Sequence, residues 1–388
     1  MVSLVLVGIG WAFAALAAAG SIYTAMTAVL ALRFFDPRRA PHAGEKAPPP
    51  LDRKVSLLKP LHGAEAELRQ NLAAHFLQDT ALPYEIVFGV QRADDPALAV
   101  ARAVMAEHPD IPSAIAVGDR AETPNRKIAN LIQLYPRATG DILVLTDSDI
   151  RPPPGHLARV LAVLDQPGVG IVTCPYFGEG AGGLWADVAA MGVSYQFLPN
   201  VIAGVSLGLA TPCMGSTIAL RRETLERIGG FEAFGGVLAD DYAMGAAVRG
   251  LGLRSRVAPV AVAHTCTEAS LNEVFRHELR WARTIRQVDL PGHAGSLVTH
   301  PVPLGLIGLI LTLGAPVAAA ILAIAIVARF LLCAVIDHAA RRRGRLPWLL
   351  PLRDMLSFVV FGASFVGQSV EWRGESFHVT AKGDLRPT

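Results

Sequence analysis

The stretch 142–149 reads ILVLTDSD, so four apolar residues run directly into two aspartates that are one residue apart. An uninterrupted apolar run that begins after Gly140 and Asp141 predicts a strand that is buried on both faces. Such strands occur in sheets that helices cover on both sides. Asp147 and Asp149 follow the carboxyl end of this strand, which is the edge where ligands bind in open α/β sheets.

The segments before this strand alternate between strand and helix patterns. Short apolar runs, rich in β-branched or aromatic residues, predict strands, and apolar residues at helical spacing predict helices. The predicted strands are 55–58, 84–90 and 113–117, and the predicted helices are 64–76, 96–106 and 126–135. This alternation predicts a parallel α/β sheet with right-handed crossovers.

The composition of the chain excludes several protein classes. Of 388 residues, 52% are apolar and only 18% are charged, whereas a soluble domain has about 25% charged residues. This excludes a disordered or collagen-like chain and argues against a purely soluble enzyme. A net charge of +2 is too balanced for a nucleic-acid binder, so we expect no nucleic acid partner. The four cysteines form no CxxC pair, which argues against a zinc site or a disulfide framework.

The apolar excess lies mainly near the two ends of the chain. Residues 2–32 contain no Asp, Glu, Lys, Arg or His, and about 20 apolar residues suffice to cross a bilayer. A cleaved signal peptide is the alternative, but the run is longer and has no basic region before it. Arg33, Arg38 and Arg39 follow, which predicts that this end of the transmembrane helix faces the cytoplasm.

A second uncharged run covers residues 302–328, where Gly314 and Pro316 predict either a kink or a hairpin. A shorter apolar run, 355–370, has the length to cross, to re-enter or to lie in the interface. The basic cluster 341–345 favours the hairpin, because such clusters are normally cytoplasmic. The number of crossings in this region stays open.

These patterns divide the chain into five predicted segments. They are an N-terminal transmembrane helix (1–32), a Pro-rich polar linker (33–52), a soluble α/β domain (53–300), a C-terminal membrane region (301–370) and a tail (371–388).

Acidic residues follow two neighbouring predicted strands. Asp95 comes after the strand 84–90, and Asp147 and Asp149 come after the strand at 142. Two carboxylates on one turn are hard ligands that suit Mg²⁺ or Mn²⁺ bridging a diphosphate, and the alternative is a solvated turn or a helix cap. The chain has neither GxGxxG after the first strand nor GxxxxGK[ST]. This argues against a dinucleotide-binding dehydrogenase and a P-loop enzyme.

Two later motifs carry further candidate residues. Asp241 lies near the start of a predicted helix, 242–249, where its alternative role is a simple N-cap. In the helical stretch 275–281, His277 and Arg280 are three residues apart and share a face. Arg280 and Trp281 stand next to a membrane segment, so interfacial anchoring is the alternative for this motif.

Together these motifs resemble the D, D, D, (Q/R)xxRW pattern of membrane-bound inverting glycosyltransferases with a GT-A fold. More closely, the chain resembles ceramide glucosyltransferases and, near them, bacterial hopanoid-biosynthesis glycosyltransferases. The segments that carry this closer likeness are VSLLKPLHG (55–63), VQRADDPA (90–97), the region of Lys127 and WRG (372–374). The resemblance covers essentially the whole chain.

The resemblance implies a GT-A domain of the α/β class with N- and C-terminal transmembrane helices. It implies that Asp241 is the catalytic base and that Asp147 and Asp149 hold Mg²⁺ or Mn²⁺. The residues implied in nucleotide-sugar binding are Asp95, Lys127, Asp147, His277, Arg280 and Trp281. Position 277 is Gln or Arg in the pattern and His here, which leaves its role open and argues against a polysaccharide synthase.

The expected reaction is transfer of N-acetylglucosamine or glucose, with inversion, from a UDP-sugar to a hydroxyl of a membrane lipid. A hopanoid polyol such as bacteriohopanetetrol is the first expected acceptor, and ceramide is the alternative. A non-catalytic protein that binds nucleotide or lipid is the alternative from another class. The resemblance implies a multi-pass protein of the bacterial inner membrane with a cytoplasmic catalytic domain. His264 is interpreted as packing under a loop rather than as a metal ligand, and Cys213 as a small buried residue.

Overall fold

The computed structural model describes residues 2–36, 38, 53–118, 123–342, 344–367, 369–372, 375–379 and 385–387. Most of the predicted linker (33–52), part of the predicted tail (371–388) and two residues of the WRG motif lie outside the described residues. The chain forms two compact units. We call residues 37–181 and 208–267 the sheet unit, and residues 1–36, 182–207 and 268–388 the helical unit.

The sheet unit is built on a seven-stranded sheet with the strand order β3-β2-β1-β4-β8-β6-β9. The strands are β1 (Val55–Pro60), β2 (Tyr84–Val90), β3 (Ser113–Val117), β4 (Ile142–Leu145), β6 (Val169–Thr173), β8 (Ile218–Arg221) and β9 (Arg254–Val257). β1 pairs in parallel with β2 and β4, as the alternating pattern predicts. β8 differs from the prediction of a parallel sheet, because it runs antiparallel to both β4 and β6. The sheet is therefore mixed, and the predicted α/β class is confirmed.

The apolar run in β4 is buried on both sides, as its sequence predicts. Ile142 and Val144 belong to one hydrophobic core, and Leu143 and Leu145 belong to the other. This split follows from the two-residue period of a strand, which sends successive side chains to opposite faces of the sheet. β4 is thus held from both sides, and the loop that follows it begins at a fixed place.

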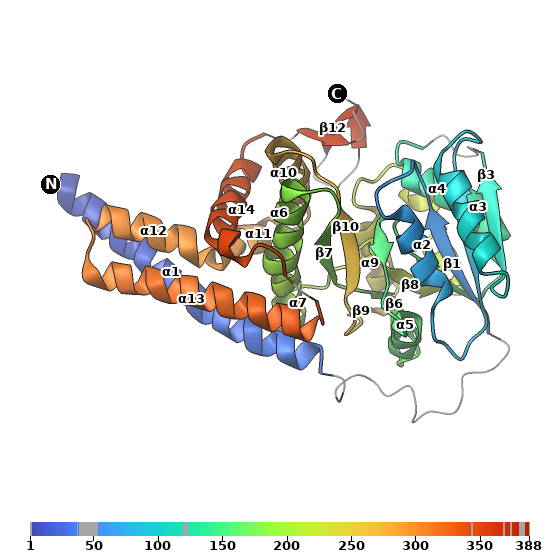
Figure 1. Ribbon diagram of the computed structural model, residues 1–388, viewed down its shortest axis with the longest axis horizontal. Coiled ribbons are helices and arrows are strands. Elements are labelled where there is room, and N and C mark those ends of the chain that lie inside the picture. The colour runs from blue at the N-terminus through green and yellow to red at the C-terminus, as the bar shows by residue number, and fades with distance from the viewer. Residues whose placement is uncertain are drawn as a thin grey trace. The chain divides into compact units, whose positions relative to one another are not determined.

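Helices cover both faces of this sheet (Figure 1). The core on one face includes residues of α2 (Leu68–Phe76), α3 (Ala97–Glu107) and α5 (His156–Leu164). The core on the other face includes residues of α4 (Arg126–Leu134), α8 (Arg222–Arg227) and α9 (Asp240–Gly250). The predicted helices before β4 are confirmed with small shifts at their ends.

A second, three-stranded sheet lies in the same unit and has the order β5-β10-β7. Its strands are β5 (Ile150–Arg151), β7 (Tyr176–Gly180) and β10 (Val262–Cys266). β5 follows β4 after only four residues, and His264 of β10 is paired with Ile150 of β5. The aspartates of the ILVLTDSD stretch therefore sit on a short loop that is fixed at both ends by strands.

The helical unit contains three helices that are long and apolar enough to cross a membrane, within the part of the chain that the structure describes. They are Leu4–Phe34 in α1 (Val2–Phe34), Leu184–Ser206 and Pro316–Ala339, which is α13. A bent pair, Leu290–Thr299 and Pro301–Leu311, is a further candidate. The apolar pattern of the sequence predicts the first and third of these helices, whereas residues 184–206 are predicted to belong to the soluble domain.

The apolar run 302–328 forms two helices rather than one kinked helix. α12 (Pro301–Leu311) ends before a turn in which Leu313 and Gly314 have φ values of 55° and 80°. α13 begins at Pro316, and both helices contact each other and α1. Glycine adopts positive φ without strain, so Gly314 favours this turn. The hairpin alternative of the sequence analysis is the one that the structure has.

The third apolar run forms α14 (Leu350–Ser364), which has 15 residues and is not among the candidate spans of the described chain. It carries two buried charged residues, Arg353 and Asp354. Asp354 forms a two-pronged ion pair with Arg329 of α13, at 2.7 and 2.8 Å. Charged residues inside an apolar bundle need such partners, because an unpaired buried charge is strongly unfavourable.

Candidate active site

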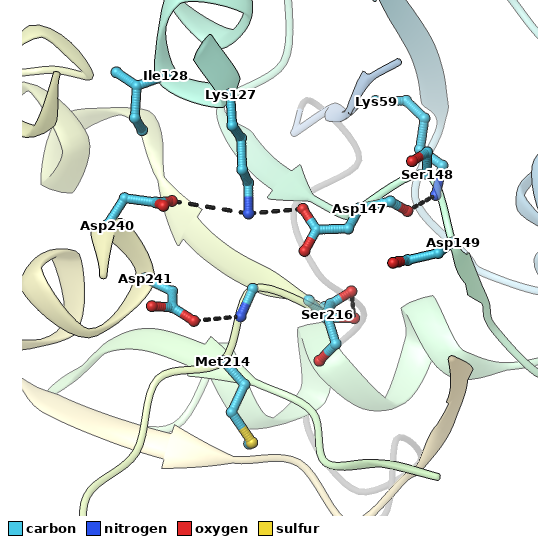
Figure 2. A network of polar contacts seen from close by, with 12 residues as sticks. Lys59, Lys127, Ile128, Asp147, Ser148, Asp149, Met214, Ser216, Asp240 and Asp241 are labelled. Atoms are coloured by element: carbon cyan, nitrogen blue, oxygen red, sulfur yellow. Dashed lines mark hydrogen bonds and ion pairs between the residues drawn. The ribbon is translucent and has the colours of Figure 1, made fainter. Parts of the chain in front are cut away.

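The loop after β4 places Asp147 next to Lys127, which belongs to α4. Asn125 caps the start of α4, because its side chain accepts hydrogen bonds from the backbone amides of Lys127 and Ile128. This cap fixes Lys127 in the first turn of the helix. The ammonium of Lys127 lies 2.6 Å from a carboxylate oxygen of Asp147 and 3.8 Å from one of Asp240. Figure 2 shows Lys127 between these two aspartates.

Asp241 lies in the first turn of α9, which begins at Asp240 after Ala239 at the N-cap position. One oxygen of Asp241 accepts a hydrogen bond of 2.8 Å from the backbone amide of Gly215, and the other accepts one of 2.7 Å from that of Tyr242. The N-cap alternative is therefore wrong, since Ala239 occupies the N-cap position and no side chain caps this helix.

Gly215 lies close to the side chains of Lys127, Asp147 and Asp241. A Cβ atom at position 215 would lie 2.9 Å from Nζ of Lys127, 3.0 Å from Oδ2 of Asp147 and 3.6 Å from Oδ2 of Asp241. The three side chains come from α4, the loop after β4 and α9, and all border the space beside this glycine. Residues far apart in the sequence thus form one charged cluster, which we call the acidic cluster: Lys127, Asp147, Asp149, Asp240 and Asp241.

Asp149 joins the acidic cluster through a different partner. Its Oδ2 atom lies 3.2 Å from Nε2 of His264 on β10, and the His264 ring lies 5.5 Å from the ring of Tyr176. The Oδ1 atom of Asp149 is buried and has no hydrogen-bond partner within the described part of the chain. His264 therefore packs against the loop 146–149, which we call the acidic loop, and pairs with Asp149. The sequence predicts only that His264 lies under a loop.

Burial and neighbouring charges set the protonation of the two aspartates that border Gly215. Burial raises the pKa of Asp241 to about 6, and the charge of Asp240 adds to this effect while Lys127 opposes it. Burial also raises the pKa of Asp147, although the ammonium of Lys127 counteracts the rise. Burial acts to lower the pKa of Lys127, but Asp147 and Asp240 outweigh it and leave the pKa above its ordinary value. Lys127 is therefore a permanent cation in this site.

His264 lowers the pKa of Asp149. Burial acts to raise the pKa of Asp149, but the charge of His264 and its hydrogen bond outweigh burial and lower that pKa. Burial likewise acts to lower the pKa of His264, and Asp149 reverses the effect and raises it well above the usual value. The two groups therefore form an ion pair of imidazolium and carboxylate.

The acidic loop fits a divalent cation through its oxygen atoms. Asp147 and Asp149 offer hard carboxylate ligands, and the Oδ1 atom of Asp149 is buried and unsatisfied among the described residues. Within the described ranges, no group of three or more His, Cys, Asp or Glu side chains is arranged to hold a metal ion. These residues therefore suit Mg²⁺ or Mn²⁺ only together with other ligands, as when a diphosphate completes the shell.

The structure places Asp95 in a different set of contacts. Its Oδ1 atom accepts hydrogen bonds of 2.9 Å from the backbone amides of Gly63 and Ala97, and its Oδ2 atom lies 3.3 Å from Nδ1 of His62. Asp95 thus ties the loop after β1 to the start of α3. These contacts lie at the carboxyl ends of β1 and β2, the edge of the sheet where the sequence analysis expects Asp95.

The remaining predicted residues belong to α10 (Leu271–Val288) of the helical unit. Nδ1 of His277 lies 2.6 Å from Oε1 of Glu268, and its ring centroid lies 4.2 Å from that of Trp281. Arg280 lies on the same helix, and its backbone carbonyl accepts a hydrogen bond from Thr284. The binding roles of His277, Arg280 and Trp281 stay predictions.

Several residues of the site were not identified from the sequence. They are Lys59, Asn125, Gly215 and Asp240. Asn125 had a usable signal, since an asparagine directly before a predicted helix is a typical N-cap. Gly215 had none, because its importance depends on side chains from three other segments.

Residues 12–385 match the sequence profile of glycosyl transferase family 21. The chain belongs to glycosyl transferase family 21. This family 21 member is 25% identical to ceramide glucosyltransferase 3 of Caenorhabditis elegans over 360 residues, which cover 86% of the chain and 74% of that relative. It is 30% identical to a ceramide glucosyltransferase of Komagataella phaffii over 122 residues, 30% of the chain and 24% of that relative. The predicted resemblance to ceramide glucosyltransferases is confirmed at the level of the family.

Among solved structures, the family 21 chain is similar to a mannosyltransferase from Pyrobaculum calidifontis in complex with GDP-Man and Mn²⁺. The TM-score is 0.44 with 21% identity, over 90% of this chain and 99% of that one. It is also similar to glucosyl-3-phosphoglycerate synthase from Mycobacterium tuberculosis with Mn²⁺, UDP and phosphoglyceric acid, with a TM-score of 0.38, 20% identity, and 61% and 78% coverage. Membership of family 21 makes the protein a sugar-transferring enzyme.

Proposed function

We propose that this enzyme transfers a hexose from a UDP-sugar to a hydroxyl of a membrane lipid, with inversion at the anomeric carbon. The observation that carries the proposal is the convergence of Lys127, Asp147 and Asp241 around Gly215. A single displacement requires a base for the acceptor hydroxyl and positive charge for the leaving diphosphate. The acidic cluster offers both within one small region.

Asp241 is the base in this proposal. Its carboxylate takes the proton of the acceptor hydroxyl while that oxygen forms a bond to the anomeric carbon. The bond between that carbon and the diphosphate breaks, and its electron pair leaves with UDP. The amides of Gly215 and Tyr242 orient the Asp241 carboxylate and favour its ionised form, which is the form that accepts a proton.

Positive charge near the leaving group comes from Lys127, which is held by Asp147 at 2.6 Å. Asp147 and Asp149 would hold Mg²⁺ or Mn²⁺, and the bound cation would supply charge neutralisation for the departing diphosphate. For the rest of the donor, we assign Asp95 to the uridine, Arg280 to a phosphate and Trp281 to stacking on the sugar or lipid. His277 is assigned to the same region of the donor without a specific role. These four assignments follow from the motif order in the sequence.

A lipid acceptor agrees with the three apolar helices of the described chain. We place a hopanoid polyol such as bacteriohopanetetrol first, because the sequence as a whole resembles bacterial hopanoid-biosynthesis glycosyltransferases within the ceramide glucosyltransferase-like group. Ceramide is the second candidate, because the named relatives are ceramide glucosyltransferases. UDP-sugars are cytosolic, so we propose a multi-pass protein of the bacterial inner membrane with a cytoplasmic sheet unit.

The test is a screen of donors against acceptors with the purified full-length protein in lipid nanodiscs. UDP-GlcNAc and UDP-glucose are each combined with bacteriohopanetetrol and with ceramide, and products are identified by mass spectrometry. We expect one glycolipid with an inverted anomeric linkage. UDP binding without any glycolipid product would favour the non-catalytic alternative, and a soluble polysaccharide would indicate a polymer synthase.

A further inference from the structure

A buried lysine lies behind the acidic loop and has no part in the mechanism above. Lys59 is the fifth residue of β1 and is only 1% exposed. Lysine is almost never fully buried unless its ammonium has partners, because removing the charge from water is costly. A methionine would fill a similar volume without this cost, so the presence of an amine here calls for an explanation.

The ammonium of Lys59 binds the backbone of the loop that carries both predicted metal ligands. It donates to the carbonyl of Asp147 and lies 3.4 Å from the carbonyl of Ile150. These two carbonyls stand on either side of Ser148 and Asp149. One side chain therefore holds both ends of residues 147–150, which we call the acidic turn. Figure 2 shows Lys59 beside this turn.

The carbonyls of Ser148 and Asp149, which lie between these two, also accept hydrogen bonds. Nδ2 of Asn71 donates to the carbonyl of Ser148 at 3.4 Å, and the amide of Thr265 donates to that of Asp149 at 2.9 Å. All four carbonyls from 147 to 150 thus have donors from β1, α2 or β10. The carboxylates of Asp147 and Asp149 in turn meet Lys127 and His264.

We propose that Lys59 is a positioning residue of the donor site, which fixes the backbone of the acidic turn so that Asp147 and Asp149 can bind a cation and its diphosphate together. The inference rests on the proposed function, because it takes a nucleoside diphosphate with a divalent cation as the ligand. Groups that support metal ligands in this way change metal affinity about 10–100-fold when they are removed.

The probe is UDP, titrated calorimetrically into the full-length protein with Mn²⁺ and, separately, with EDTA. The variant is Lys59→Met, which keeps the length of the side chain and removes the charge and the donors. We expect Mn²⁺ to strengthen UDP binding to the wild type and this gain to fall about 10–100-fold in the variant. The affinity in EDTA should stay near that of the wild type.

The matched control is Lys54→Met. Lys54 precedes the same strand, and its ammonium pairs with Glu85 at 2.5 Å, away from the acidic turn. This control should keep the full gain from Mn²⁺. A general loss of folding would instead lower the number of binding sites and weaken binding with and without Mn²⁺ alike.

An unchanged gain from Mn²⁺ in Lys59→Met would overturn the inference and leave the proposed function intact. Failure of the wild type to bind UDP with Mn²⁺ would overturn the proposed function and the inference with it. If Lys59→Met does not fold, Asn71→Leu decides, because it removes the donor to the carbonyl of Ser148 together with the hydrogen bonds between Asn71 and Thr265, and it leaves Lys59 in place. That variant should also lose part of the gain, and a full gain would contradict the role of the fixed turn.

Discussion

At the scale of single residues, Lys127 is the basic member of the acidic cluster, which also has four carboxylates. Lys127 contacts Asp147 and lies near Asp240, and its charge also counteracts the rise in the pKa of Asp241. A donor that carries a diphosphate would bring further negative charge into this cluster. The arrangement is therefore suited to a ligand that arrives together with a divalent cation.

The first residue-scale prediction concerns the base. Asp241→Asn keeps the shape of the side chain and one of its two hydrogen-bond acceptors but removes the proton acceptor. General-base catalysis contributes about 10²–10⁴-fold, so kcat should fall by that factor while UDP affinity stays close to that of the wild type. Glycolipid formation and UDP calorimetry measure the two quantities. Undiminished turnover would remove Asp241 from this role.

The same carboxylate predicts the pH dependence of the reaction. Because burial raises the pKa of Asp241 to about 6, the base is protonated below that pH and ionised above it. We expect kcat/KM to rise about tenfold per pH unit below pH 6 and to level off above it. The profile is measured with saturating cation at constant ionic strength. A profile that is flat between pH 5 and 7 would contradict the assignment.

A raised carboxyl pKa also affects folding. The folded state binds the proton of Asp241 more tightly than the unfolded chain does, so this contribution to stability is present at low pH and is lost as the pH rises through about 6. The shift from 3.8 to about 6 corresponds to about 3 kcal/mol at pH 7, so Asp241→Asn, which does not titrate, should gain stability relative to the wild type as the pH rises from 4 to 7. Thermal unfolding at both pH values tests this expectation.

Gly215 gives a prediction of steric origin. In Gly215→Ala the new Cβ would lie within 3.0 Å of Lys127 and Asp147, which is closer than side chains normally approach. We expect the acidic cluster to be displaced and kcat/KM to fall by at least about tenfold, since small displacements of catalytic groups are costly. Gly236→Ala is the control, because a Cβ there meets nothing within 4 Å. Equal activity of the two variants would argue against a crowded site at Gly215.

At the scale of elements, the site is assembled from the ends of strands and the first turns of helices. The strands β1 to β4 and the helices between them could be predicted, because their apolar patterns are local and regular. The direction of β8 could not, because antiparallel pairing with β4 and β6 depends on where the chain returns after residue 207. Gly215 comes just before β8, so the position of this glycine in the site could not be predicted either.

The cap of α4 gives a prediction at this scale. Asn125→Ala removes the acceptor for the amides of Lys127 and Ile128 and the donor to Asp240. Loss of such a cap costs about 1 kcal/mol, and the first turn that carries Lys127 should become less ordered. We expect a modest fall in melting temperature. The KM for the donor should rise, because Lys127 is held less firmly. Asn125→Asp restores the cap acceptor but places a second carboxylate beside Asp240, so it should recover only part of the stability.

At the scale of the whole molecule, the chain divides into units that interleave along the sequence. Residues 184–206 belong to the helical unit although they lie between segments of the sheet unit. Their mean hydropathy of 1.3 is lower than the 2.0 and 2.7 of the other two candidate spans, which explains why these residues have no clear transmembrane pattern. Most of this helix is buried by its neighbours, so polar side chains on it can be satisfied within the protein.

The ion pair between Arg329 and Asp354 is tested at this scale, because it joins α13 to α14. Removing one partner leaves a buried charge unpaired, which costs about 3–5 kcal/mol. Arg329→Met and Asp354→Leu should each lower the melting temperature of the detergent-solubilised protein strongly. The double variant should be more stable than either single one. Additive losses in the double variant would indicate that the two residues act independently.

The sequence by itself determined the α/β class, the strands and helices before residue 145, the apolar ends and the positions of the acidic motifs. These features depend on local patterns, in which each side chain follows its neighbours on one strand or helix. Only the tertiary structure decided that Asp147 and Asp241 meet beside Gly215, that Lys59 lies behind the acidic turn and that residues 184–206 join the helical unit. Such contacts join segments far apart in the chain, and no local pattern records them.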